Sequence, residues 1–484
     1  MSKILAFDLG ASSGRAMLAE YKDGKIRMQE IHRFTNDPVT VNGTMYWDTL
    51  RLFYDIKTGI TKAVNAGGFD YVGIDTWGVD FGLVGEDGQL VTNPVHYRDK
   101  RTDDYLDFPV PAGEVYASTG IQQMQINTLY QLESMVRNHM DQLERTKMLL
   151  FTPDLLNYFL TGVGKTEYTI ASTSQMLDAR ARYWDMELIK KAGIPTQMLG
   201  KIVQPGTICG TLSDEICEEL SAPKAKVVCI ASHDTASAVA SIPTQAEDFL
   251  YISCGTWALL GTELKQPVLD EKAQEYNFAN EGGINGTIRF LKNIMGTWLI
   301  QESRRQWIRE GNEYGFGELE SMAKQAQPFK CLIDVDRPEF IKPGNIPRRI
   351  AAYCERTGQP VPQGPGEIIR CIDESLALKF RYGFECVEDC TGIGYDVVHI
   401  LGGGTKSALL CQMTADASGK KVAAGPDEAT VLGNIAVQLI AAGEIASIAE
   451  ARQVVADSCE LKEYAPQGGS EWEKAYANFR KIME

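Results

Sequence analysis

The sequence predicts an α/β protein made of two halves of related design, and three observations support this fold class. The length of 484 residues allows two or three domains at roughly 150 residues per domain. Short apolar runs that end at acids or glycines alternate with segments whose apolar residues recur at helical spacing. A pattern of strand, small-residue tip and strand occurs near the N-terminus and again near residue 255, which indicates an internal repeat.

The first half begins with a predicted hairpin. The apolar run 4–7 stops at Asp8, the tip is Gly-Ala-Ser-Ser-Gly (10–14), and an apolar stretch resumes over 15–20 before a turn at 22–25. Further strands are predicted at 71–75, 79–84 and 227–231. Helices are predicted at 47–66, 127–150 and 153–161.

The second half repeats this beginning. The apolar run 249–252 is followed by the tip Ser-Cys-Gly-Thr (253–256) and a second strand at 257–261. A strand at 397–401 leads into three glycines (402–404) and a helix from Lys406. Pro, Asp and Glu at 426–428 suit the first turn of another helix, for which Gly443 is the expected C-terminal cap. We expect the halves to join near 241–243, with domains at 1–242 and 243–484.

Composition narrows the function classes. Hydrophobic residues make up 44% and charged residues 23%, which are globular proportions, and the formal net charge is −16. Such an acidic protein is not expected to bind nucleic acid or anionic membranes. There is no signal-peptide pattern and no run of 18 apolar residues, and none of the eleven cysteines precedes Cys209, so a cytoplasmic protein is expected. The CxxxC pair at Cys386 and Cys390 and the five scattered histidines do not indicate a zinc site.

Two segments could bind phosphate, and a third only imitates a phosphate loop. Gly-Val-Gly-Lys-Thr (162–166) ends like a P-loop, but the upstream glycine position is Phe159, and no GxGxxG follows a strand. Asp8 beside the 10–14 tip suits a phosphate held by backbone N–H groups with a hydrated Mg²⁺ on the carboxylate, although an ordinary hairpin turn fits equally well. The similar tip at 255–256 favours phosphate binding, because a triphosphate needs contacts from two sides.

Two other segments suit a sugar hydroxyl. Asp234 ends a strand among small residues and could accept a proton from a hydroxyl, or could instead cap a helix. The segment Asp-Thr-Trp-Gly-Val-Asp (75–80) combines two acids with an aromatic ring. That composition suits a sugar-binding site, and a buried core tryptophan is the alternative.

These segments together resemble the FGGY carbohydrate kinases. The matching stretches follow the family order over almost the whole chain: DLGASSGR (8–15), EIHRF (30–34), GIDTWGVDF (73–81), YRDKRT (97–102), NTLYQL (127–132), ASHDTASAVA (231–240), GTWALLG (255–261), NEGG (280–283), LKNIMGTWLIQ (291–301) and GGG (402–404). Within the family the chain is most similar to the branch that phosphorylates the 1-hydroxyl of L-rhamnulose.

The resemblance implies two actin-like ATPase (RNase H-like) domains with a cleft between them, with sugar mainly on the first domain and ATP mainly on the second. It implies ATP and Mg²⁺ as the cosubstrate and cofactor, with Asp8 near the metal. The implied nucleotide contacts are Ala11, Ser12, Ser13, Gly14, Arg15, Thr256, Gln301 and Gly403. The implied sugar contacts are Gly78, His233, Asp234, Thr235 and Asn293, and Asp234 matches the catalytic base.

The resemblance leaves other functions open, and this chain departs from the family pattern at one pair of cysteine positions. Two other functions fit the same motifs. One is another ketose kinase, for L-fuculose or D-xylulose, and the other is a non-catalytic actin-like nucleotide-binding regulator. The motifs do not indicate an oligomeric state. Thr414 and Ser418 stand where one bacterial family member carries cysteines, so that disulfide is impossible here. Cys354 and Cys371 match a family pair in spacing, and a cytoplasmic chain is expected to keep them reduced.

Overall fold

The computed structural model describes residues 2–483, which form two compact units that are discontinuous along the chain. Unit 1 comprises the described residues up to Gln245 together with Glu263–Phe290 and Ala429–Cys459. Unit 2 comprises Ala246–Thr262, Leu291–Glu428 and the described residues from Glu460 onward. The sequence predicted one contiguous division at 242/243. In the structure, two later segments return to unit 1.

Unit 1 contains a six-stranded sheet of order β13-β14-β6-β1-β2-β3. Its strands are β1 (Ser2–Leu9), β2 (Ser13–Lys22), β3 (Lys25–Thr35), β6 (Tyr71–Thr76), β13 (Thr207–Thr211) and β14 (Lys226–Cys229). The predicted β1–β2 hairpin is confirmed, while β3 was not predicted. β6 is parallel to both β1 and β14, so the carboxyl ends of these strands lie at one edge of the sheet.

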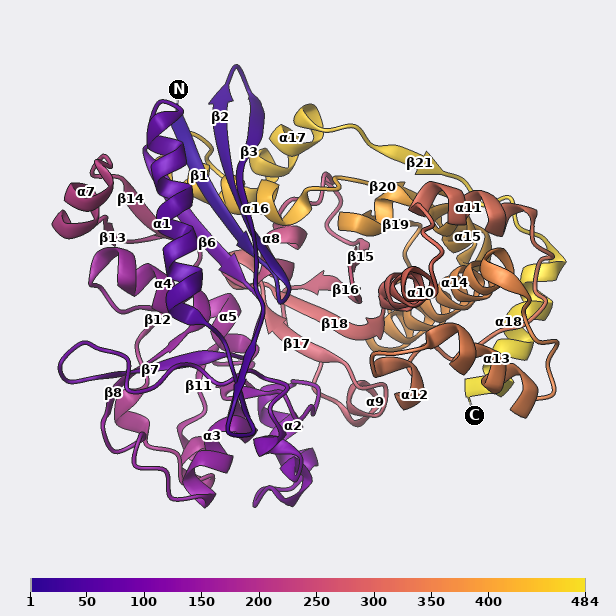
Figure 1. The fold of residues 1–484 in the computed structure, drawn as a ribbon, viewed down its shortest axis with the longest axis horizontal. Helices are drawn as coiled ribbons and strands as arrows, with labels where there is room; N and C mark the ends of the chain where they lie inside the picture. Colours follow the sequence, from indigo (N-terminus) through magenta and orange to yellow (C-terminus); the bar gives the residue numbers. More distant parts are fainter. Residues whose placement is uncertain (1, 484) are drawn as a thin grey trace. The chain divides into compact units, whose positions relative to one another are not determined.

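Helices cover both faces of this sheet, because alternate residues of a strand point to opposite faces. Leu5 and Phe7 of β1 pack in one core cluster with residues of α1 (Thr49–Asn65). Ile4 and Ala6 pack in another with residues of α16 (Ala429–Ala442). Figure 1 shows α1 running alongside β1. The predicted end of α16 is confirmed by Gly443, whose φ is +77°.

One predicted helix of unit 1 is wrong in its C-terminal half. The expected helix 127–150 ends early: α3 spans Thr128–Arg137, and Thr146–Phe151 is strand β8, which pairs with β7 (Phe81–Gly85). The helix expected at 153–161 is α4 (Thr152–Thr161). A short apolar run such as 148–151 fits a strand as well as a helix, and pairing with β7 decides the outcome.

The second sheet has the order β17-β18-β16-β15-β19-β20-β21. Its strands are β15 (Leu250–Cys254), β16 (Trp257–Leu264), β17 (Ala279–Gly282), β18 (Ile288–Met295), β19 (Val397–Leu401), β20 (Lys421–Ala424) and β21 (Lys462–Tyr464). β15 is antiparallel to β16 and parallel to β19, just as β1 is antiparallel to β2 and parallel to β6. The predicted internal repeat is therefore confirmed.

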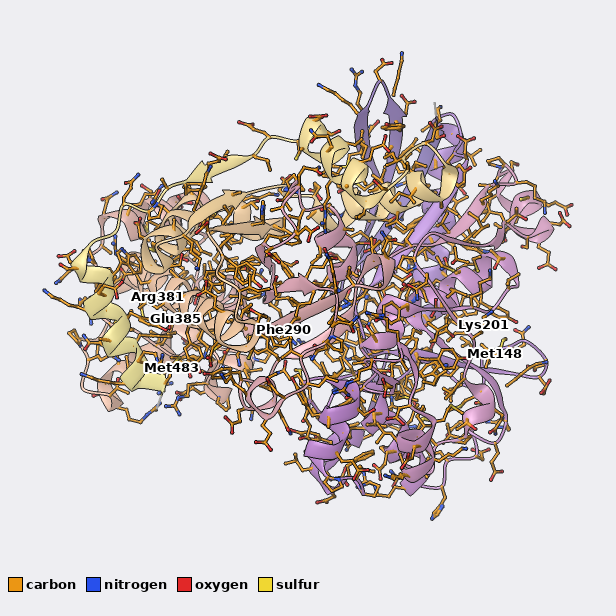
Figure 2. The ribbon with its side chains drawn as sticks, turned by 180° about the vertical axis from the view of Figure 1, so that it is seen from behind. Met148, Lys201, Phe290, Arg381, Glu385 and Met483 are labelled. Atoms are coloured by element: carbon orange, nitrogen blue, oxygen red, sulfur yellow. The ribbon has the colours of Figure 1, made fainter. Side chains whose placement is uncertain are left out.

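Unit 2 is covered largely by helices. Its long helix α14 (Gly364–Thr391) packs on α15 (Ala408–Ser418) and α18 (Ser470–Met483). Arg381 and Glu385 on α14, labelled in Figure 2, face α18: the Arg381 guanidinium lies 2.7 Å from the Glu473 carboxylate, and Tyr476 donates to Glu385. α14 and α18 were not predicted from the sequence, whereas a helix from Lys406 was, and it begins at Ala408.

The other described helices and strands are β4 (Val39–Val41), β5 (Thr44–Tyr46), α2 (Ala112–Thr119), β9 (Thr166–Glu167), α5 (Tyr168–Ser172), β10 (Leu177–Asp178), β11 (Tyr183–Trp184), α6 (Met186–Lys191), β12 (Ile202–Val203), α7 (Asp214–Leu220), α8 (Asp234–Ala240), α9 (Glu271–Glu275), α10 (Trp298–Arg309), α11 (Phe316–Gln325), α12 (Pro338–Ile341), α13 (Ile346–Arg356) and α17 (Ile448–Ser458). Within residues 2–483, no helix is both long and apolar enough to cross a membrane.

Candidate active site

Carboxylates from distant parts of the sequence lie at the ends of the parallel strands of unit 1. Asp8 on β1 is in register with Asp75 on β6. The N–H of Thr76, which ends β6, donates to the Ser232 carbonyl at 2.9 Å, in the loop that leads to Asp234. This edge is where ligands bind in parallel sheets, and the sheet order explains how residues near 8, 75 and 234 come to one place.

The first hairpin tip is held by hydrogen bonds of its own. The Gly10 N–H donates to the Ser13 carbonyl at 2.9 Å, and the Asn36 amide donates to the Gly10 carbonyl at 3.0 Å. The Arg15 guanidinium donates from Nε and Nη2 to the same oxygen of Asp8, at 3.0 and 2.8 Å. The structure thus joins the residue expected near the metal to a residue expected at the phosphates.

Gly14 lies in this predicted phosphate loop, but its lack of a side chain has a local cause. A Cβ at Gly14 would lie 2.4 Å from the ring of Phe34, which is its register partner on β3. Substitution of Gly14 would therefore disturb the β2–β3 pair before it affected any ligand. Ala11, Ser12, Ser13 and Arg15 are partly or fully exposed.

Asp234 is the first residue of α8, directly after the loop that follows β14. About a third of its side chain is exposed (34%), and its Oδ1 accepts from the N–H and hydroxyl of Thr235. Desolvation by the surrounding protein raises the pKa of Asp234, and the charge of Asp8 adds to this effect while His233 opposes it. A carboxylate with a raised pKa and an exposed face is suited to accept a proton.

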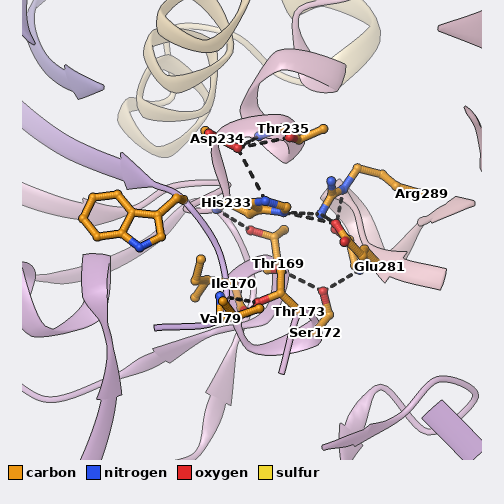
Figure 3. Close-up of polar contacts among 12 residues, drawn as sticks. Val79, Thr169, Ile170, Ser172, Thr173, His233, Asp234, Thr235, Glu281 and Arg289 are labelled. Atoms are coloured by element: carbon orange, nitrogen blue, oxygen red, sulfur yellow. Dashed lines mark hydrogen bonds and ion pairs between the residues drawn. The ribbon is translucent and has the colours of Figure 1, made fainter. Parts of the chain in front are cut away.

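His233 connects Asp234 to a buried ion pair that the sequence motifs did not single out as functional (Figure 3). His233 Nε2 lies 3.4 Å from Asp234 Oδ1. On the other side of the ring, Nδ1 lies 3.1 Å from Arg289 Nη2, with which it forms a hydrogen bond, and 3.1 Å from Glu281 Oε2. Arg289 is fully buried and lies 2.9 Å from Glu281, whose pKa falls to about 2 because of Arg289 and His233 despite its burial.

The backbone before Asp234 is fixed by a second buried group, which the sequence analysis also missed. The Ser232 N–H donates to Glu167 Oε2 at 3.1 Å, and the His233 N–H donates to the Thr169 hydroxyl at 3.2 Å. That hydroxyl in turn donates to Glu167 at 2.6 Å. Burial raises the pKa of Glu167 to about 7. Only the three-dimensional structure brings residues 167–169 to this loop, so the sequence carried no signal for them.

The 75–80 segment is buried except at Gly78. Trp77 is 6% exposed, and its indole N–H donates to Asp80 at 2.9 Å, as the Trp47 indole does at 2.6 Å. Burial raises the pKa of Asp80 to about 6. The core interpretation is therefore correct for Trp77. Gly78 is half-buried, and a Cβ there would lie 3.1 Å from Thr173.

In unit 2, the predicted nucleotide contacts gather around the second hairpin tip. Thr256 is exposed between β15 and β16, and its carbonyl accepts the N–H groups of Gly296 and Trp298. The Thr297 hydroxyl donates to the Gly255 carbonyl at 2.7 Å and accepts from the Gln301 amide at 3.0 Å. Gln301 is thus connected to the tip through one hydroxyl.

The glycines 402–404 follow β19 and lie against the end of β15. A Cβ on Gly404 would lie 2.5 Å from the Cys254 side chain, and Gly402 has a φ of +72°. Gly403 is exposed, and the nearest atom to a Cβ there would be the Cys254 carbonyl oxygen at 3.7 Å. Packing and backbone conformation account for the first and third glycines, which leaves Gly403 as the glycine facing solvent.

The predicted residues thus fall into two sets. Asp8, Ala11–Arg15, Gly78 and His233–Thr235 belong to unit 1, while Thr256, Asn293, Gln301 and Gly403 belong to unit 2. Within the described range 2–483, no group of three or more histidines, cysteines or acids could hold a metal ion. None of the cysteines in the described part of the chain, Cys354 and Cys371 included, forms a disulfide.

Comparison with known proteins identifies the class. The N-terminal domain of the FGGY family of carbohydrate kinases matches residues 3–241, and its C-terminal domain matches 250–442. The chain belongs to this family of ATP-using sugar kinases. Among solved structures, a xylulose kinase from Lactobacillus acidophilus (TM-score 0.80, 16% identity, 100% of this chain and 96% of that one) and Plasmodium falciparum glycerol kinase with ADP (0.81, 15%, 100% and 98%) share the two-domain fold.

Relatives with higher sequence identity than these solved structures are rhamnulokinases. A rhamnulokinase from Bacteroides thetaiotaomicron is 41% identical over 482 residues, covering 99% of both chains. Rhamnulokinases from Halalkalibacterium halodurans (42% identity, 96% of this chain and 99% of that one) and Bacillus subtilis (40%, 96% and 95%) are similar over nearly the same span.

Proposed function

We propose that this chain transfers the γ-phosphoryl group of ATP to the 1-hydroxyl of L-rhamnulose, giving L-rhamnulose 1-phosphate and ADP. The observation that carries the proposal is identity of about 40% to several rhamnulokinases over almost the full length of both chains. The acid Asp234, which begins α8 and is partly exposed, supports a catalytic protein over a nucleotide-binding regulator, which needs no base.

Asp234 is the proposed base. A primary hydroxyl is a weak nucleophile, so a carboxylate that accepts its proton as the O–P bond forms is typically worth about 10²–10⁴-fold in rate. The hydroxyl oxygen attacks phosphorus, the bond to the ADP oxygen breaks, and the proton moves to Asp234. Gly78, His233, Thr235 and Asn293 are the proposed sugar contacts.

The nucleotide contacts proposed are Ala11, Ser12, Ser13, Gly14, Arg15, Thr256, Gln301 and Gly403. Backbone N–H groups at the two small-residue tips suit phosphate oxygens. Asp8 is the proposed Mg²⁺ contact. A single carboxylate fits this role, since Mg²⁺ is usually held by one or two carboxylates together with phosphates and water. When bound, the ion supplies charge neutralisation on the transferred phosphoryl group.

A cytoplasmic location is part of the proposal, because cysteines without disulfides suit a reducing compartment. The sugar is proposed to bind mainly the 1–242 domain and ATP mainly the 243–484 domain.

An assay of ADP release over a panel of ketoses tests the function. L-Rhamnulose is expected to give the highest kcat/KM, with phosphate on oxygen 1 of the product. A clear preference for L-fuculose or D-xylulose would show that the proposed substrate is wrong. ATP binding without any sugar-dependent ADP release would favour the non-catalytic nucleotide-binding regulator.

A further inference from the structure

Both ring nitrogens of His233 face charged side chains: Nδ1 faces Arg289 and Glu281, and Nε2 faces Asp234. Nδ1 lies 3.1 Å from Arg289 Nη2 in a hydrogen bond, and a guanidinium can only donate. Nδ1 also lies 3.1 Å from Glu281 Oε2, but within residues 2–483 that oxygen receives no hydrogen bond. Nδ1 is therefore the acceptor from Arg289, which places the ring proton of a neutral histidine on Nε2. Nε2 is the nitrogen 3.4 Å from Asp234 Oδ1.

Arg289 is held firmly enough to set this arrangement. Its side chain is fully buried, its Nε donates to the Gly282 carbonyl at 2.8 Å, and its Nη2 lies 2.9 Å from Glu281. The Glu281 carboxylate keeps the buried guanidinium compensated, and without it the charge would be costly to bury. β17 and β18 thus carry the ion pair that contacts the histidine.

From this geometry we propose that Arg289 is a positioning residue for Asp234: by donating to Nδ1 of His233, it fixes the histidine tautomer that presents Nε2–H to the Asp234 carboxylate. The inference rests on the proposed function, in which Asp234 is the base. An N–H that faces a carboxylate favours its ionised form and holds its orientation. Arg289 thereby keeps Asp234 ready to accept the proton of the sugar hydroxyl.

The carboxylate has other charged or titratable neighbours. The charge of Asp8 from β1 opposes its ionisation, and Asp75 from β6 and Tyr97 also interact with it. His233 is faced by Glu281 and Arg289. Thr235 also donates to Oδ1 from its N–H and its hydroxyl, and the Nε2–H adds a further contact that favours the ionised state.

Nitrogen NMR of the full chain labelled at histidine tests the tautomer without any sugar. The five histidines are few enough to assign, with a His233→Asn variant identifying the signal. We expect the proton of neutral His233 on Nε2 in the unaltered protein. In Arg289→Met the Glu281 carboxylate is left beside Nδ1, so the proton is expected to move to Nδ1.

Kinetics over the pH range in which NMR shows a neutral ring provide the second readout. Arg289→Met should lower kcat by about tenfold or more and move its acid limb to higher pH, because Asp234 loses the N–H that favours ionisation. The charge-balanced Arg289→Met/Glu281→Gln variant removes the pair together and should also lower kcat. Arg452→Met, which breaks another buried pair of unit 1 (Arg452 Nη2 to Glu263, 2.8 Å), should affect stability but neither the tautomer nor the acid limb.

The outcomes are distinct. A proton on Nδ1 in the unaltered protein would overturn the inference even if no variant folds, and so would unchanged kcat and pH profile in Arg289→Met. If the unaltered chain phosphorylates no ketose while the proton lies on Nε2 and moves in Arg289→Met, the positioning stands and the proposed function is wrong.

Discussion

Asp234 shows how a single residue acquires its chemistry from its surroundings. By type alone it could cap a helix, and it does lie at the start of α8, where it accepts from Thr235. Its raised pKa comes from desolvation and from the charge of Asp8, a residue more than 200 positions earlier in the sequence. The sequence motif located the residue, but Glu281 and Arg289, which contact its neighbour His233, became visible only in the fold.

At this scale, Thr256 gives a testable contact for the nucleotide. Thr256→Ala removes an exposed hydroxyl, while the backbone carbonyl that anchors Gly296 and Trp298 remains. We expect KM for ATP to rise severalfold and KM for the sugar to stay within twofold, measured by steady-state ADP release. An equal rise in both constants would show a general disturbance of the loop instead of a phosphate contact.

Elements were predictable where their pattern was local. The two hairpins, α1 and the glycine stop of α16 follow from short runs, helical periodicity and caps. The segment 146–151 was mispredicted because its short apolar run, 148–151, suits a helix or a strand, and its pairing with β7 decides which one forms. The long helix α14 is buried over much of its surface, so its sequence lacks a clean polar face to predict it.

Helix α8, which begins with Asp234, packs directly against α16. A Cβ at Gly433 of α16 would lie 1.7 Å from the Ser237 carbonyl oxygen of α8. Gly433→Ala must therefore push α8 away, and with it the Asp234 that begins this helix. We expect a loss of unfolding free energy of about 2 kcal/mol or more, measured by urea denaturation, together with reduced kcat.

Gly317 is the matched control, because it is helical, exposed and has no atom within 4 Å of a Cβ. Gly317→Ala should stabilise the protein by about 0.5–1 kcal/mol through helix propensity. Equal stability changes in the two variants would contradict the account of the α8–α16 contact.

At the scale of the whole molecule, both units bury carboxyl groups that favour the protonated state. Burial raises the pKa of Asp80 to about 6, of Glu167 and Glu374 to about 7, and of Asp373 to about 8. In the unfolded chain these groups titrate near pH 4. Between about pH 4 and these raised values the folded state binds more protons, so rising pH removes stability.

The melting temperature is therefore expected to fall by several degrees from pH 5.5 to 8.5 at constant ionic strength. Asp373→Asn should make this fall shallower, since it replaces the group with the highest of these pKa values by a neutral amide of the same shape. A melting temperature that rises over this range, or an unchanged slope in Asp373→Asn, would show that these groups do not control the pH dependence.

The repeated sheet order, β14-β6-β1-β2 in one unit and β20-β19-β15-β16 in the other, explains why two similar small-residue tips exist at all. The repeat was predictable from the hairpins, because each is a local pattern. The later chain segments that complete unit 1 were not, since their partners are distant in the sequence: Arg289 contacts His233, 56 residues away, and Gln438 contacts Leu5, 433 residues away.

The central claim is that Asp234 accepts the proton of the ketose 1-hydroxyl during phosphoryl transfer from ATP. Asp234→Asn tests it most directly, because the amide keeps the shape and removes the proton acceptor. Turnover with L-rhamnulose is expected to fall on the order of 10²-fold or more, while ATP binding measured by calorimetry and the melting temperature stay close to those of the unaltered protein. Near-normal turnover in a folded Asp234→Asn protein would contradict the account.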